Sequence, residues 1–140
     1  MYIYSYTESW YDIIQNLLNE ISDRYLWYKI SKLSSKIYKQ LQYFKTNQIV
    51  DWYSVKHLEN QIFEFKISIP NTKDLIRLLF AWERDELVLL TWYLIKPENY
   101  NKIHTRTEVN KYYHQQINDA NTILQDYKSS KKLTYQLIDL

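Results

Sequence analysis

The chain has 140 residues, 46% of them hydrophobic and 24% charged, which suits a single water-soluble domain with one buried core. Its formal net charge is only +2, so a nucleic-acid site would have to come from a local basic patch. The absence of cysteine excludes disulfides and thiolate metal sites, and the absence of glycine excludes glycine-rich phosphate loops and dinucleotide fingerprints.

Neither a signal peptide nor a membrane span is expected, so we predict a cytoplasmic protein. Residues 1–5 carry no basic region and no long apolar run. The most apolar stretch, residues 75–95, is interrupted by charges that a bilayer would not tolerate: Arg77, Glu83, Arg84, Asp85 and Glu86.

The N-terminal third predicts two helices, after a short stretch at 2–6 that is compatible with an edge strand. Ser5 and Glu8 have the spacing of a capping box, and apolar residues recur behind them at helical spacing from Trp10 to Ile21. Ser22 or Asp23 can cap a second helix. Its apolar positions are Leu26, Ile30, Leu33, Ile37, Leu41 and Phe44. A short connection predicts an antiparallel helical hairpin.

The middle of the chain predicts an antiparallel meander of three strands. Periodicity fades over 47–60, which we expect to be a loop, and residues 62–69 then alternate between apolar and polar side chains. Two mostly apolar strands follow at 75–82 and 87–95, with turns at 70–74 and 83–86. Because glycine is absent, turns that need a positive φ must use Asn or Asp. The predicted loops contain Asn47, Asn60, Asn71, Asn99 and Asn101.

A final helix is predicted after a loop at 97–104. Thr105 and Glu108 form a second capping-box pattern. Apolar positions then follow at helical spacing: Val109, Tyr113, Ile117, Ala120, Leu124 and Tyr127. The fold class is therefore α+β, with a domain over 1–128, and residues 129–140 form either a last strand or a mobile tail.

Three segments carry a family resemblance. They are Leu58-Glu59-Asn60-Gln61-Ile62-Phe63-Glu64-Phe65-Lys66, Ile76-Arg77-Leu78-Leu79-Phe80, and Leu89-Leu90-Thr91-Trp92-Tyr93-Leu94-Ile95-Lys96. In order and spacing they resemble the RelE/HigB toxin superfamily, above all phage-derived HigB-like toxins. The chain departs from the family pattern at Gln61, where the family has glycine, at Lys66, where it has arginine, and at Thr91-Trp92, where it has His-Gly. Of a family pair of lysines only Lys96 remains.

The resemblance implies a RelE-like fold and a type II toxin that cuts mRNA, often on the ribosome, without a cofactor or a metal. The 2′-hydroxyl attacks the neighbouring phosphate and the 5′-oxygen leaves, which requires an acid, a base and cations near the phosphoryl oxygens. The implied partners are a cognate antitoxin, through which an oligomer can form, and mRNA with or without the ribosome.

Strand register adds a geometric hypothesis about the site. If the two turns centre near Thr72 and on Arg84-Asp85, then Lys66, Arg77 and Tyr93 form one row across the sheet. Arg77 is a candidate phosphate clamp, because a charge inside an apolar strand is costly without a task or a partner. The alternative is a structural ion pair with Glu64 or with a helix acid. Lys66 is either a phosphate contact or an ordinary outward-facing lysine. Tyr93 either stacks on a base or packs in the core.

The other candidate residues flank the third strand and the last helix. Lys96 is a catalytic candidate because it follows the end of a strand, and the alternative is an ordinary exposed lysine. His104 would serve as general acid or base, with a solvated loop histidine as the alternative. Trp92 and Arg106 join Tyr93 as candidate substrate contacts. His57 and His114 lack metal-ligand spacing, so no metal site is expected.

Two other functions stay open. One is a non-catalytic binding protein of the same fold that poisons a protein target, as relatives resembling ParE act on gyrase. The other is an inactive scaffold that survives as an interaction module.

Overall fold

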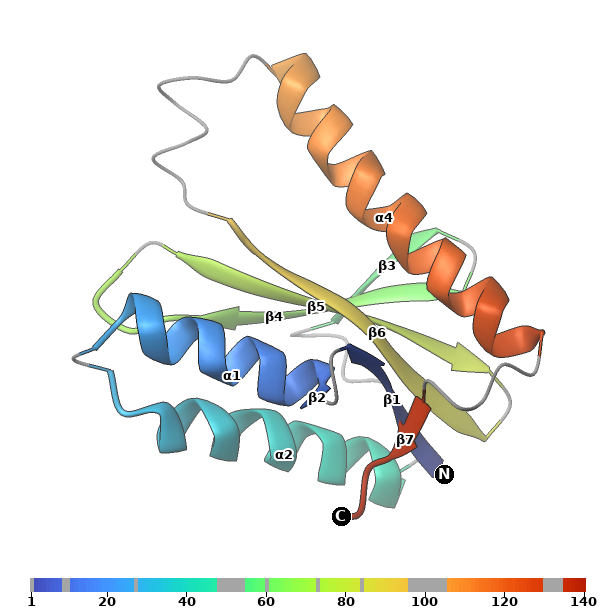
Figure 1. Ribbon diagram of the computed structural model, residues 1–140, viewed down its shortest axis with the longest axis horizontal. Helices are drawn as coiled ribbons and strands as arrows, with labels where there is room; N and C mark the ends of the chain where they lie inside the picture. The colour runs from blue at the N-terminus through green and yellow to red at the C-terminus, as the bar shows by residue number, and fades with distance from the viewer. Residues whose placement is uncertain are drawn as a thin grey trace.

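In the part of the chain that the computed structural model describes, three helices cover the two faces of one seven-stranded sheet (Figure 1). The structure describes residues 2–8, 11–26, 28–47, 55–59, 61–72, 74–83, 85–95, 106–129 and 135–140. The strands are β1 (Tyr2–Glu8), β2 (Tyr11–Asp12), β3 (Val55–Glu59), β4 (Ile62–Ser68), β5 (Leu75–Glu83), β6 (Glu86–Ile95) and β7 (Tyr135–Leu137). The helices are α1 (Ile13–Arg24), α2 (Ile30–Asn47) and α4 (Arg106–Lys128).

The strand order is β2-β1-β6-β5-β4-β3, and β7 also pairs with β1. The predicted meander is confirmed as β4, β5 and β6, which pair antiparallel in sequence order. The stretch at 2–6 is a strand, as its sequence allowed, but it is not an edge strand. The helical hairpin that we expected at the start of the fold follows it. β1 opens the chain, and it lies inside the sheet, parallel to β6 on one side and antiparallel to β7 on the other. The α+β class therefore stands, but the order of elements begins with a strand.

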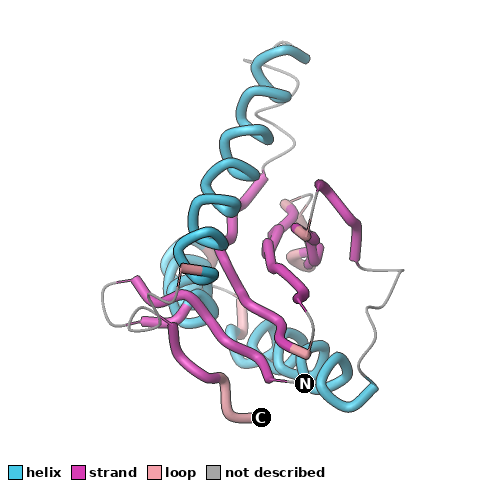
Figure 2. Tube along the Cα trace, turned by 90° about the vertical axis from the view of Figure 1, so that its right-hand side faces the viewer, coloured by secondary structure: helices cyan, strands magenta, loops and turns pink. Residues whose placement is uncertain are grey.

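The two faces of the sheet have separate cores. The side chains of α1 and α2 pack with Ile67, Leu78 and Phe80 on one face. On the other face, Ala120 and Leu124 of α4 pack with Leu79 and other sheet residues. Figure 2, turned by 90°, shows α4 along one side of the strands and the two termini close together. No helix within the described residues is long and apolar enough to cross a membrane.

Helix α1 begins later than the capping-box pattern predicted. Ser5 lies in β1, and Asp12 is the N-cap, with its carboxylate accepting from the amide of Gln15 at 2.8 Å. Ser5 still serves this helix from the neighbouring strand, because its buried Oγ accepts from the amide of Ile13 at 3.0 Å. The local pattern was misread because the serine reaches the helix through tertiary structure.

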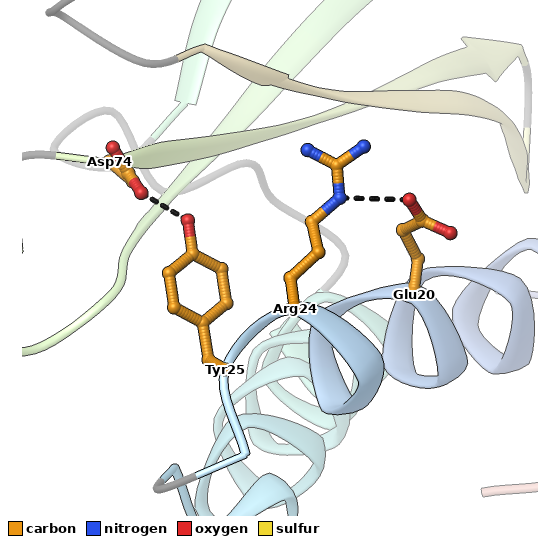
Figure 3. A network of polar contacts seen from close by, with 4 residues as sticks. All are labelled: Glu20, Arg24, Tyr25 and Asp74. Carbon is orange, nitrogen blue, oxygen red and sulfur yellow. Dashed lines mark hydrogen bonds and ion pairs between the residues drawn. The ribbon is translucent and has the colours of Figure 1, made fainter.

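The connection between α1 and α2 also differs from the prediction. Ser22 and Asp23 lie inside α1, which ends at Arg24, so neither caps a second helix. Leu26 lies outside both helices and is 89% exposed. Leu33, Ile37, Leu41 and Phe44 are buried as expected. Figure 3 shows how the end of α1 is fastened to the sheet: the Tyr25 hydroxyl donates to the buried carboxylate of Asp74.

Two loop regions contain strands. Residues 55–59 of the predicted loop form β3, at the edge of the sheet beside β4. At the C-terminus the strand alternative is correct, since β7 pairs with β1 and the amide of Ile138 donates to the carbonyl of Ile3 at 2.8 Å. The predicted loop at 97–104 lies outside the described residues.

Candidate functional site

The predicted row across the sheet is present. Lys66 in β4 pairs with Arg77 in β5, and Arg77 pairs with Tyr93 in β6. Residues that pair directly across strands point to the same face. That face is the one that α4 covers, because Tyr93 belongs to the core with α4 residues. The register hypothesis is therefore confirmed for all three residues.

Exposure falls steeply along the row. Lys66 is exposed, the Arg77 side chain is 16% exposed, and Tyr93 is 5% exposed. Only the β4 end of the row is thus open to a large ligand. At the β6 end of the row, Tyr112 and Tyr113 of α4 contact the ring of Tyr93, which contributes to its burial.

Arg77 forms an ion pair with Glu64, two residues before Lys66 on the same face of β4. The Arg77 Nη1 lies 2.5 Å from Glu64 Oε1, and the Glu64 side chain is 1% exposed. Burial lowers the pKa of Arg77, but the hydrogen bond and the negative charge of Glu64 outweigh it, so this pKa lies above its ordinary value. The alternative reading of Arg77 as a structural ion pair with Glu64 is correct.

The pair is not fully satisfied. Glu64 Oε2 and Arg77 Nε are buried and have no hydrogen-bond partner within the described part of the chain. The Tyr93 hydroxyl donates to Glu64 Oε1 over 3.4 Å, a long contact. Burial, followed by the charge of Glu64, raises the pKa of Tyr93, so Tyr93 is a neutral phenol at ordinary pH and not a base.

Two tyrosines of α4 complete the cluster, and no local pattern predicted their role. The guanidinium carbon of Arg77 lies 5.2 Å from the ring centroid of Tyr113, a cation–π distance. Tyr93 meets the rings of Tyr112 and Tyr113 edge-on, at centroid distances of 5.8 and 6.2 Å. Tyr112 is 42% exposed. The spacing of the last helix placed Tyr113 on its apolar face, but only the tertiary fold places it over Arg77.

The remaining candidates are not brought into this cluster. Trp92 points to the opposite face and packs against the core beneath α1 and α2, so it does not share the surface of the row. Lys96 and His104 lie outside the described residues. Arg106 is the first residue of α4, and its side chain is likewise outside the described part.

A metal centre finds no support in the described residues, since no three of their His, Asp and Glu side chains gather closely enough to hold an ion. The arrangement instead offers an exposed lysine beside a buried, aromatic-lined ion pair. Comparison with known proteins finds no matching family model, no matching curated protein and no matching solved structure.

Proposed function

We propose that this chain is the toxin of a type II toxin–antitoxin pair and acts as an mRNA endoribonuclease of RelE/HigB type. The observation that carries the proposal is the row of Lys66, Arg77 and Tyr93 on one face of the meander. The resemblance anticipated such a site on these strands. The succession of two helices, meander and final helix also supports it. The order departs from the expected one, because β1 and β2 precede the helices, β3 precedes the meander and β7 follows α4.

In this proposal Lys66 contacts the scissile phosphate, because it is the exposed cation of the row. Arg77 acts as a positioning residue: its pair with Glu64 holds β4 and β5 together beneath the phosphate site. This differs from a direct phosphate clamp, since Glu64 already neutralises much of the Arg77 charge. The resemblance assigns further roles in the site to Lys96 and Arg106, whose side chains lie outside the described part of the chain.

The chemistry needs no cofactor. A base takes the proton of the 2′-hydroxyl, the O2′–P bond forms as the P–O5′ bond breaks, and an acid protonates the leaving O5′. The products are a 2′,3′-cyclic phosphate and a 5′-hydroxyl. His104 is the residue assigned to proton transfer, since an imidazole titrates near neutral pH. The antitoxin would cover the basic end of the row.

Inducible expression in a bacterial host tests the proposal, with growth and total-RNA integrity followed together. Arg77→Ala is a poor choice, because it leaves Glu64 buried without its partner. Lys66→Ala is the better variant, because Lys66 is exposed. The matched control is Lys128→Ala, which removes an exposed lysine in the last turn of α4. We expect arrest with RNA cleavage in the wild type and in Lys128→Ala, and neither in Lys66→Ala at equal soluble level. Normal growth with soluble wild type would contradict the proposal.

One observation favours a non-catalytic protein of the same fold as the second candidate. Arg77 and Tyr93 both donate hydrogen bonds to the buried carboxylate of Glu64. Two of the three row residues therefore stabilise the structure. A binding protein of this kind would inhibit a protein target or serve as an interaction module. Growth arrest with intact RNA would favour it.

A further inference from the structure

The outer face of α2 concentrates positive charge. The helix contains four lysines and no acidic residue, so the rest of the chain is net negative, given its total of +2. Lys32, Lys36 and Lys39 follow at spacings of four and three, which places them on one side of the helix. All three are exposed, and neither ion pair found among the described residues involves them.

This face also has a hollow and uncharged hydroxyl groups. A shallow hollow of about 370 Å³ lies on it, lined by Ser31, Lys32, Ser35, Lys36 and Lys39. Hydroxyl groups both donate and accept hydrogen bonds, and serines commonly contact phosphates and sugars in nucleic-acid complexes. Tyr43, 42% exposed, follows Lys39 one turn further along and adds a phenol hydroxyl, a group that also contacts phosphates.

We propose that the outer face of α2, formed by Ser31, Lys32, Ser35, Lys36 and Lys39, docks on the phosphate backbone of double-stranded RNA. From Lys32 to Lys39 the helix rises about 10 Å. Measured along the duplex axis, one strand carries a phosphate every 3.4 Å or so, so three lysines over this rise face a similar number of phosphates. The match of spacing and charge points to a nucleic-acid backbone.

Other partners fit this face less well. An amphipathic helix binds a membrane through exposed apolar residues, but the apolar positions Leu33, Ile37 and Leu41 are buried against the rest of the domain. A protein partner of acidic character would need an apolar centre for its interface, and the hollow is lined only by lysines and serines.

The choice of RNA over DNA rests on the proposed function and on the serines. The wide minor groove of an RNA duplex displays 2′-hydroxyls, which Ser31 and Ser35 can reach as donors or acceptors. The docking face lies on the side of the sheet opposite to α4 and Lys66. A bound duplex would therefore leave the row accessible, so one molecule could dock on structured RNA and act on a single strand.

Binding of the full chain to a short RNA duplex, followed by fluorescence anisotropy over a salt series, tests the proposal. The variant is Lys32→Gln/Lys36→Gln/Lys39→Gln, and circular dichroism checks that its helix content is unchanged. The control, Lys56→Gln/Lys111→Gln/Lys128→Gln, removes the same charge from exposed lysines elsewhere. We expect the α2 variant to lose about 0.9 per lysine from the slope of log K against log salt, roughly 2 to 3 in all. The control should lose much less.

An equal loss in both variants, or an unchanged slope in the α2 variant, would overturn the docking face. Ser31→Ala/Ser35→Ala should abolish a preference for RNA over a DNA duplex of the same sequence. Equal binding of RNA and DNA by the wild type, or tighter binding to phosphatidylserine vesicles or polyglutamate, would overturn the assignment to RNA. Because Lys66→Ala reports on cleavage and the α2 variant on docking, the two proposals can fail separately.

Discussion

At the scale of the residue, the Glu64–Arg77 pair decides how the site is built. A buried ion pair adds little to the free energy of unfolding compared with an apolar pair. Removing one partner, however, leaves the other charge buried and unpaired. We expect Arg77→Met and Glu64→Leu each to lower the free energy of unfolding by about 3 kcal/mol or more. The double variant should recover much of that loss. Urea denaturation of all three measures it, and single variants that cost no more than the double would contradict the account.

Tyr93 makes a prediction about alkaline pH. Its pKa is raised in the folded state, mainly by burial, whereas the unfolded chain releases this proton near pH 10. The contribution of Tyr93 to the free energy of unfolding is therefore fully present below pH 10. It falls as the pH rises further, because the unfolded state then binds fewer protons than the folded state. Tyr93→Phe should lessen this fall, while Tyr2→Phe, at an exposed position, should not. Urea midpoints measured at neutral and alkaline pH test this prediction. A fall that is as large in Tyr93→Phe as in the wild type would contradict it.

Sequence reasoning could identify these residues but could not rank their roles. Arg77 stood out as a charge in an apolar strand, and Glu64 was already a conceivable partner. Lys66 and Glu64 both alternate outward on the same strand, yet one is exposed and the other buried. The difference depends on where α4 lies, and no local pattern in β4 contains that information.

At the scale of the element, the β4–β5 turn sets the register that aligns the row. Asn71 has φ 63° and is the only residue in the described part of the chain with positive φ. This confirms the expectation for Asn71, whereas Asn47 lies at the end of α2 and not in a loop. A β-branched residue is costly there, so Asn71→Val should lower the free energy of unfolding by about 1–2 kcal/mol, whereas Asn71→Gly should not. Equal stability of both variants, by urea denaturation, would refute this role.

The meander and the last helix were predictable because their signals are local. Alternation, short turns and helical spacing all act within a few residues. The N-terminal elements were misread because β1 takes its hydrogen bonds from β6, about eighty residues later in the chain. β3 was missed because its short sequence lacks regular alternation and gains its place by pairing with β4.

At the scale of the whole molecule, the two ends of the chain complete the sheet together. β7 pairs with β1, and Ile138 behind it is 7% exposed, while the neighbouring Leu137 is 51% exposed. We expect Ile138→Ala to cost about 2 kcal/mol or more of unfolding free energy, because it leaves a cavity in the core. Leu137→Ala, the matched control, should cost far less. A negligible effect of Ile138→Ala would mean that the C-terminal strand contributes little.

The central claim is RNA cleavage at the exposed end of the row, and the most direct measurement is the chemistry of the product ends. Purified protein would be incubated with mRNA, with and without ribosomes, beside Lys66→Ala and an mRNA carrying a 2′-deoxy sugar at the mapped cut. We predict 5′-hydroxyl and 2′,3′-cyclic phosphate ends from the wild type, loss of cleavage in Lys66→Ala, and no cut at the deoxy site. Intact RNA from folded wild-type protein under both conditions, or cleavage that persists at the deoxy site, would contradict the account.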